Sequence, residues 1–310
     1  MHKMQRRVFG SSKHLDKYPN RIKAKETAPV MGFERELKVK NTRKLFASRI
    51  KMFFGKTMFS LLRETKKATR TLKKNPQEPK NIANDDFFTK LEEYAESIDL
   101  KIGYTKLTQD LIFNNHAVIF DNAIVLSMEM DKKKIDNAPS LKTGRMVIRT
   151  YDELGIRVNK ITKFVRKEGF SAEACHPLGG PIGFVPLALR AGMGWVGRHG
   201  LLITPDYGPR HRLAAVLTNI TNLPLIEENP HQWVGEYCST CGRCIKTCPG
   251  EAILETPISS EEGRKTHIIF DKCFQVFAEE FGCSVCIKEC MFNRVGYQKL
   301  KENFDKKRKK

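Results

Sequence analysis

Eight of the nine cysteines lie after Tyr237, in two groups whose spacing can do metal chemistry. The first group is Cys238-x2-Cys241-x2-Cys244-x3-Cys248, followed directly by a proline. Iron–sulfur clusters need thiolate ligands because soft sulfur matches iron, and this run is typical of a site for such a cluster. Paired C-x2-C motifs also build tetrahedral zinc sites, although zinc sites rarely combine two successive x2 gaps with x3-Cys-Pro. The spacing therefore favours an iron–sulfur centre over zinc.

The second group of cysteines supplies the ligands that a pair of clusters requires. In two-cluster proteins the fourth cysteine of the first run ligates the other cluster, and eight thiolates suffice for two [4Fe–4S] clusters. The long gap after Cys273, and Met291 in place of a proline after Cys290, depart from the standard run and leave the partition of the ligands open. The expected partition is Cys238, Cys241, Cys244 and Cys290 on one cluster, and Cys248, Cys273, Cys283 and Cys286 on the other.

A second chemical signal is a glycine-rich stretch formed by Gly192, Gly194, Gly197 and Gly200. Glycines at this density let the backbone approach a ligand closely and leave N–H groups free to face polar atoms. The stretch is not a P-loop, since no Gly-Lys-Ser/Thr follows, and its order is wrong for a dinucleotide fingerprint. Taken alone, it is equally compatible with a turn-rich loop.

Residues 187–225, taken together with the cysteines, resemble one enzyme superfamily. The segment "AGMGWVGRH" is similar to the epoxyqueuosine reductases, and "GLLITPDYGPRHRLAAVLTNITNLPL" is closer to the reductive dehalogenases. The resemblance covers about residues 120–295, whereas residues 1–82 match neither family.

The resemblance implies both a fold and a set of cofactors. The expected fold class is α/β (or α+β), with a nitroreductase-like domain that binds cobalamin without its own base on cobalt. A ferredoxin-like module with two [4Fe–4S] clusters would follow it and deliver single electrons. Residues 192–212 would line the corrinoid, with contacts from Gly197, Arg198, Gly200, Thr204, Gly208 and Arg210.

The resemblance also implies a proton donor just before a helix that leads to the glycine-rich stretch. That donor is a tyrosine in the dehalogenases and an aspartate in the epoxyqueuosine reductases, and this chain has both, Tyr151 and Asp152. Tyr151 fits the dehalogenase pattern better. A buried phenol can donate a proton if a cation stabilises the phenolate, and the candidates are Arg149, Arg190 and Arg210. The alternative is structural: Tyr151 packs at a helix entry and Asp152 caps the helix.

Other chemically active residues carry weaker patterns. Cys175 has no partner and is expected to be a buried structural thiol, and its neighbour His176 lacks the third partner of a nucleophilic triad. His116, His199 and His211 share no ligand-like spacing with a carboxylate, so we expect surface or core roles for them.

Hydrophobic patterning predicts the elements that position these residues. Apolar residues recur at helical spacing in 85–98 and 157–170, and 122–130, 200–205 and 212–220 have the character of strands. Strands that alternate with helices argue for a mixed α and β architecture. The expected domains are a basic N-terminal extension with an amphipathic helix over 1–82, an α/β corrinoid-binding catalytic domain over 83–230, a dicluster ferredoxin-like domain over 231–298 and a basic disordered tail over 299–310.

Positive charge is concentrated at the two ends. Of the net charge of +20, residues 1–80 contribute +17 and residues 299–310 contribute +5, so the rest is near neutral. Apolar residues from Phe46 to Leu62 recur at helical spacing among lysines and arginines. Such a basic amphipathic helix suits an anionic membrane surface, or else packs its apolar stripe on the main domain. Basic extensions also suit tRNA, whose backbone is recognised electrostatically.

These features together define the expected function. We expect a cytoplasmic protein, with peripheral membrane association through the basic N-terminal region, because no stretch reaches the roughly 18 apolar residues of a membrane span. The expected activity is reductive cleavage by a cobalamin-dependent iron–sulfur oxidoreductase, acting on a small organic substrate or tRNA. Its electrons would come from a low-potential donor of the ferredoxin or flavodoxin type. The alternatives are a ferredoxin-type electron-transfer protein without corrinoid and a nucleic-acid-binding protein with structural clusters.

Overall fold

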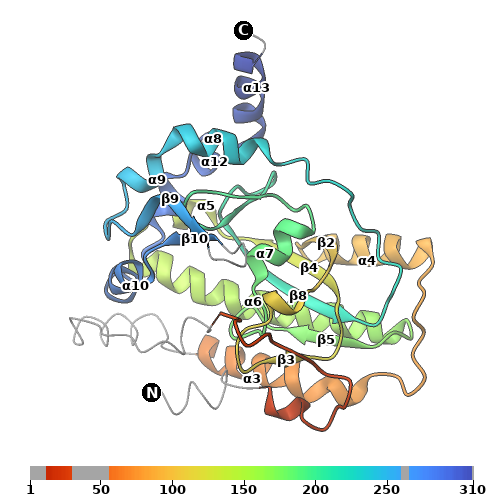
Figure 1. Cartoon of the computed structure of the whole chain (residues 1–310). Helices are drawn as coiled ribbons and strands as arrows, with labels where there is room; N and C mark the ends of the chain where they lie inside the picture. The colour runs from red at the N-terminus through yellow and green to blue at the C-terminus, as the bar shows by residue number, and fades with distance from the viewer. Residues whose placement is uncertain (1–11, 30–55, 260–264, 309–310) are drawn as a thin grey trace.

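The structure, a computed structural model, describes residues 12–29, 56–259 and 265–308. A four-stranded sheet lies at its centre. The strand order is β2-β4-β8-β5, and every neighbouring pair is antiparallel (Figure 1). The expected strands at 122–130 and 212–220 are confirmed, within a mixed α/β fold. The strands of this sheet are β2 (Lys101–Lys106), β4 (Asn122–Glu129), β5 (Ala172–Cys175) and β8 (His211–Thr218).

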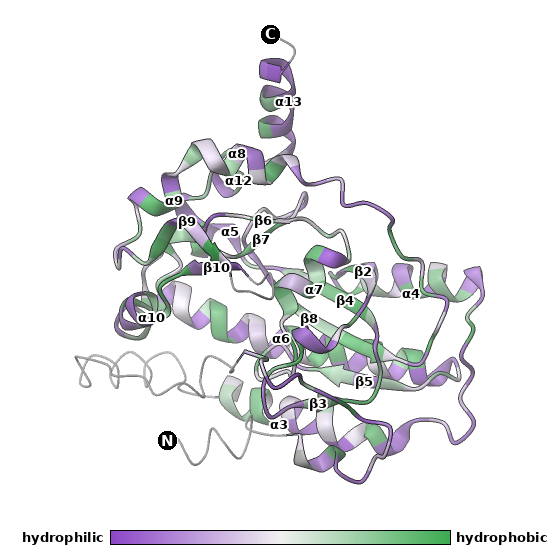
Figure 2. Ribbon diagram, viewed as in Figure 1, coloured by the Kyte–Doolittle hydropathy of each residue, from purple (hydrophilic) through white to green (hydrophobic). Residues whose placement is uncertain are grey.

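Helices cover both faces of the sheet. α4 (Asp85–Ser97) and α6 (Leu141–Lys167) pack on one face, and α7 (Phe184–Arg190) packs on the other. Successive residues of β4 enter different cores, because Ile124 faces the α6 side while Val125 faces the α7 side. This double burial explains why the middle residues of β4 and β8 are apolar on both faces of the sheet (Figure 2).

α6 is longer than the helix expected from the sequence. The Ser140 side chain accepts a hydrogen bond of 3.1 Å from the Thr143 amide at the start of the helix, and Gly169, with φ of +92°, follows its end. Tyr151 and Asp152 therefore lie in the middle of a helix, not just before one. The expected N-cap role of Asp152 is wrong, because the helix begins a dozen residues earlier, at Ser140.

α3 (Lys56–Arg70) packs against α6 and β5 (Figure 1). Leu61 is fully buried, and the carboxylate of Glu64 accepts a 3.0 Å hydrogen bond from the side-chain amide of Asn159 on α6. This part of the N-terminal region therefore buries its apolar stripe on the main body. The residues from Phe46 to Gly55 of the expected amphipathic helix lie outside the described residues.

The cysteines lie in a unit of short elements that follows β8 and the loop after it. Its members are α8 (Trp233–Cys241), α9 (Arg243–Lys246), β9 (Ile253–Ser259), β10 (Lys265–Ile268), α10 (Phe270–Glu279), α11 (Val285–Glu289) and α12 (Met291–Arg294). Outside this unit the chain also forms β1 (Ile22–Lys23), β3 (Ala117–Val118), α5 (Lys132–Ile135), β6 (Trp195–Val196), β7 (Leu202–Ile203) and the 3-10 turns η1 (Lys13–Leu15), η3 (Thr71–Lys74) and η4 (Gln109–Leu111).

The final helix, α13 (Tyr297–Arg308), corrects one expectation. The sequence analysis predicted a disordered tail over 299–310, on the basis of its charge. Leu300 is buried, however, and Phe304 packs on Trp233 with ring centroids 5.4 Å apart. These two apolar side chains, four positions apart, anchor the helix, whereas Lys306, Lys307 and Arg308 near its end are exposed. In the described part of the chain, no helix has both the length and the apolar character needed to cross a membrane.

Candidate functional site

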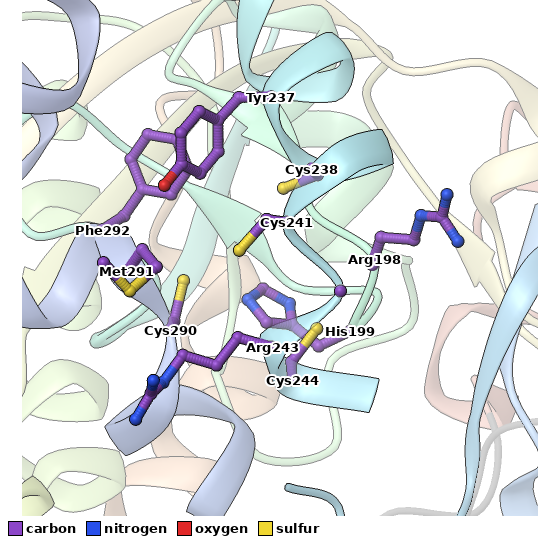
Figure 3. A pocket seen from close by; sticks show the side chains of 11 residues that line it. Arg198, His199, Tyr237, Cys238, Cys241, Arg243, Cys244, Cys290, Met291 and Phe292 are labelled. Carbon is purple, nitrogen blue, oxygen red and sulfur yellow. The ribbon is translucent and has the colours of Figure 1, made fainter. Parts of the chain in front are cut away.

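Four cysteines from three segments converge on one pocket. Cys238 and Cys241 lie on α8, Cys244 lies on α9, and Cys290 lies between α11 and α12. All four line a pocket of about 300 Å³, its open mouth included (Figure 3). The structure therefore brings together the four residues that the sequence analysis assigned to one cluster. We call them the first cysteine set.

A left-handed turn at Gly242 allows this convergence. Its φ is +57°, a conformation that glycine adopts without the cost paid by other residues. A Cβ at this position would meet nothing within 4 Å, so the requirement is conformational and not steric. Beyond the turn, the guanidinium of Arg243 binds the Glu289 carboxylate at 2.7 Å and ties α9 to α11.

The other four cysteines, Cys248, Cys273, Cys283 and Cys286, form the second cysteine set. Burial first, and then the neighbouring Cys283 and Cys248, together raise the pKa of Cys273 to about 11. Burial also raises the pKa of Cys286, which has Cys283, Cys273, Cys244 and Cys248 as electrostatic neighbours. Because Cys244 belongs to the first set, Cys286 lies where the two sets adjoin.

Backbone N–H groups point at several of these sulfur atoms. Burial raises the pKa of Cys238 to about 12, and a hydrogen bond from the backbone of Arg198 opposes this rise. The amides of Phe292 and Asn293 act in the same way on Cys290, whose pKa burial raises. Such N–H donors stabilise thiolates and tune the metal centre that the thiolates hold. The donor set and its surroundings therefore fit iron–sulfur clusters.

The loop that carries Cys283 has an unusual backbone. Phe281, Gly282, Cys283 and Ser284 all have φ between +45° and +84°. Each non-glycine residue in this region costs on the order of 1 kcal/mol, and such strain is concentrated at functional sites. The Ser284 hydroxyl donates to the Gly282 carbonyl at 3.1 Å, and the Val285 amide donates to the Cys283 sulfur. The strained loop thus presents Cys283 to the second cysteine set.

The residues expected to contact a corrinoid lie on the β6–β7 hairpin and in the turn that follows it. The hairpin tip is held at Arg198. Its amide donates to the Cys238 sulfur, its carbonyl accepts from the His267 ring, and its guanidinium donates to the Ser239 carbonyl at 3.2 Å. The hairpin therefore joins the cysteine unit to the body of the protein.

The glycines of this region serve close packing between protein segments. A Cβ on Gly208 would lie 2.9 Å from the Phe292 carbonyl oxygen, and one on Gly200 would lie 3.2 Å from the Cβ of His267. A Cβ on Gly197 would lie 2.7 Å from the side chain of Ile203. Protein atoms therefore lie close beside these three glycines, and the contact of their backbone with a corrinoid stays a prediction.

Thr204 and Arg210 hold the turn after β7. The amides and carbonyls of Thr204 and Gly208 exchange hydrogen bonds of 3.0 and 2.9 Å. The guanidinium of Arg210 donates to the Tyr207 carbonyl at 2.9 Å and to Glu129 at 2.7 Å. Both predicted residues are therefore fixed in place next to β4 and β8.

Tyr151 and Asp152 face different neighbours. Tyr151, like Leu201 and Cys286, packs against the buried cluster that contains Ile287, and the guanidinium of Arg212 lies 4.5 Å from the centre of its ring. Asp152 faces α3: burial raises the pKa of its carboxyl group, and a hydrogen bond with Ser60 opposes that rise. Of the two candidates, Tyr151 is the one beside the cysteine unit.

The cation beside Tyr151 is one that the sequence analysis missed. The expected Arg149 pairs with Glu153 on the same helix, and Arg190 pairs with Asp110. The alternation of side chains along β8 is the signal that could have identified this cation. Arg212 shares a face of β8 with Ala214 and Val216, which contact α6, so the strand pattern would have placed its side chain under that helix.

Buried nitrogen atoms of this region lack hydrogen-bond partners among the described residues. Since buried polar groups are normally paired, such a concentration fits a ligand rich in hydrogen-bonding groups. The amide-bearing corrin ring is a ligand of that kind, so these nitrogens fit a corrinoid. They are Nε of Arg210, Nδ1 of His211, Nε of Arg212 and Nδ1 of His267.

Comparison with known proteins finds relatives of two kinds. A tetrachloroethene reductive dehalogenase from Desulfitobacterium hafniense is 34% identical over 189 residues, which are 56% of this chain and 33% of that protein. An epoxyqueuosine reductase from Synechocystis sp. is 36% identical over 124 residues, 37% of this chain and 41% of that protein. No protein-family model matches the chain.

The fold is similar to that of a catabolic reductive dehalogenase, with a TM-score of 0.61 and 18% identity over 91% of this chain and 46% of the other. The chain spans about a third of the length of the curated dehalogenases that it matches. Its relatives in sequence support the superfamily that the motifs indicated, that of the reductive dehalogenases and epoxyqueuosine reductases.

Proposed function

We propose that this chain is a reductase that carries two [4Fe–4S] clusters and binds a corrinoid, at which its substrate is cleaved reductively. The observation that supports it best is the crossed convergence of the cysteines. Cys290, the last in sequence, joins the first cysteine set, and Cys248 joins the second. This is the exchange of ligands that two-cluster proteins use.

Each cofactor has a place in this proposal. When bound, the clusters supply single-electron transfer and a corrinoid supplies a strongly reducing cobalt centre. The two cysteine sets adjoin at Cys244 and Cys286, so the clusters would form a short path for electrons. The nitroreductase-like domain would hold the corrinoid beside the β6–β7 hairpin, where the unpaired nitrogens lie.

Tyr151 is the proposed proton donor. Reductive cleavage of a carbon–halogen bond consumes two electrons and one proton and releases the halide, and cleavage of a carbon–oxygen bond consumes a second proton. In either case a proton must come from a group beside the site. The Oη of Tyr151 can supply it, because the Arg212 guanidinium over the ring stabilises the phenolate that remains. Tyr151 is partly buried against the hydrophobic cluster that includes Ile287.

A small organic substrate is favoured over tRNA. The match to the dehalogenases covers 56% of the chain, whereas the match to the epoxyqueuosine reductases covers 37%. tRNA is retained as the second candidate because the N-terminal region is strongly basic. Supply of electrons by a ferredoxin or flavodoxin type donor belongs to the same proposal.

The test is anaerobic reconstitution followed by metal analysis. We expect about eight iron atoms per chain, from two cubane clusters. With hydroxocobalamin present, we also expect about one cobalt per chain and a base-off absorption spectrum. Turnover would then be assayed with tetrachloroethene and with an epoxyqueuosine-modified stem loop. Eight irons without cobalt would instead favour a ferredoxin-type electron-transfer protein, and binding of the RNA without turnover would favour the nucleic-acid-binding alternative.

A further inference from the structure

His199, at the tip of the β6–β7 hairpin, lies in the wall of the first cysteine pocket. Its side chain is 5% exposed and lines the pocket together with all four cysteines of the first set. Figure 3 shows its imidazole among the sulfur atoms of Cys241, Cys244 and Cys290. The sequence pattern predicts only a surface or core role for this histidine, and the proposed mechanism does not use it.

A backbone hydrogen bond determines which ring nitrogen of His199 carries the proton. The amide of Leu201 donates to Nδ1 at 3.2 Å, so Nδ1 is an acceptor and the proton of the neutral ring lies on Nε2. The Nε2–H is itself buried and has no hydrogen-bond partner among the described residues.

The hairpin holds this ring in one position. The imidazole packs over Gly197, where a Cβ would lie 2.9 Å from Cε1 and 3.3 Å from Nε2. The next residue, Arg198, is fixed at its amide, its carbonyl and its guanidinium, so the tip cannot turn without breaking these contacts. A buried donor in a fixed orientation costs free energy unless an acceptor completes it.

We propose that His199 donates its Nε2–H to a sulfur atom of the cluster held by the first cysteine set. The inference rests on the proposed function, because it requires that cluster, and it adds a residue that sets the cluster's potential. Hydrogen bonds to the sulfurs stabilise the additional negative charge of the reduced state and therefore raise the reduction potential. His199 is thus a positioning residue for electron transfer and not a proton donor to substrate.

The experiment is a redox titration of the reconstituted protein, followed by electron paramagnetic resonance. His199→Leu removes the donor, whereas His199→Gln keeps an N–H group within reach. For His199→Leu we expect one cluster to become harder to reduce by on the order of tenfold, about 59 mV for one electron. His199→Gln should recover part of that shift. His176→Leu, which removes a buried histidine beside α3, should leave both potentials unchanged.

A second measurement does not depend on how well the variants fold. In reduced protein labelled with ¹⁵N-histidine, electron–nuclear double resonance should show a histidine nitrogen and an exchangeable proton coupled to one cluster. The coupling should be absent from His199→Gln. Full iron content with no coupling in the labelled protein, or with unchanged potentials in His199→Leu, overturns the inference and leaves the proposed function intact. A wild-type chain that holds no iron after reconstitution refutes the proposed function itself.

Discussion

At the scale of single residues, the proposed proton transfer depends on the opposite directions in which Tyr151 and Asp152 point from α6. Tyr151→Phe keeps the ring and its contact with Arg212 but removes the proton donor. We expect a 10²- to 10⁴-fold loss of turnover, the usual contribution of a general acid, with unchanged iron content. Asp152→Asn is the matched control and should retain activity, because Asp152 faces α3. The assignment is wrong if the aspartate variant loses turnover and the tyrosine variant does not.

A buried carboxylic acid on β5 gives the molecule a measurable dependence of stability on pH. Burial raises the pKa of Glu173 from 4.5 to about 7, although the Ile119 amide donates to it at 2.8 Å. The folded state therefore holds a proton that the unfolded state loses as the pH rises from 4.5 to about 7. Stability is fully present below this window and falls through it, by about 3 kcal/mol in all.

The variant Glu173→Gln removes this titration and keeps an acceptor for the Ile119 amide. Relative to wild type, its free energy of unfolding should rise by roughly 1.4 kcal/mol per pH unit between pH 5 and 7 and then stay level. Urea denaturation at several pH values measures the difference between the two proteins. A constant difference from pH 5 to 8 would show that Glu173 is ionised in the folded protein throughout.

At the scale of elements, the spacing of apolar residues correctly predicted which helices and strands contribute to the core. The helical stripe of Val158, Ile161 and Val165, and the unbroken apolar run of β4, both lie in the core where the pattern placed them. The convergence of Cys290 with Cys238 also follows from the spacing, because an iron–sulfur run requires its fourth ligand from elsewhere. These features depend on residues close together in the sequence or on the rules of one cofactor.

Other features depend on contacts between distant segments. The length of α6 placed Tyr151 inside a helix, and Arg212 became its partner through pairing in the sheet. A sequence cannot show whether protein or cofactor occupies the space beside a missing Cβ, and beside Gly197, Gly200 and Gly208 protein atoms lie within 3.2 Å of a Cβ position. The position of His199 follows from the docking of the hairpin on α8, which no local pattern encodes.

Two apolar side chains, Leu300 and Phe304, hold α13 against the rest of the protein. Phe304 packs on Trp233, and Trp233 also donates its indole N–H to the Tyr297 hydroxyl at 2.8 Å. Phe304→Ala should lower the free energy of unfolding by about 1–2 kcal/mol, because the ring is half-buried, and should increase amide exchange along α13. Asn303→Ala, on the exposed side of the same helix, should change neither quantity. Equal exchange in both variants would show that the helix stands without its apolar anchor.

At the scale of the whole molecule, the cysteine unit is packed on the body through α11. Ile287, 5% exposed, lies in one hydrophobic cluster with Met130, Ile135 and Tyr151. Beside it, the Lys288 ammonium donates to the carbonyl of Ala138 at 2.9 Å. The same contact surface therefore includes the proposed proton donor and, through Cys286, the second cysteine set.

This shared surface predicts that cluster binding and the packing around Tyr151 are coupled. Ile287→Ala removes apolar contacts from both sides, and we expect a loss of about 2–4 kcal/mol in the free energy of unfolding. Lys288→Ala, which removes one polar contact beside the same surface, should cost about 1 kcal/mol or less. Hydrogen exchange of the reconstituted protein provides the decisive measurement. If the two parts stabilise each other, Ile287→Ala will increase exchange in α6 as well as in α11. If exchange rises in α11 alone, the body is stable without the cysteine unit, and the residues around Tyr151 are positioned by the sheet and not by the clusters.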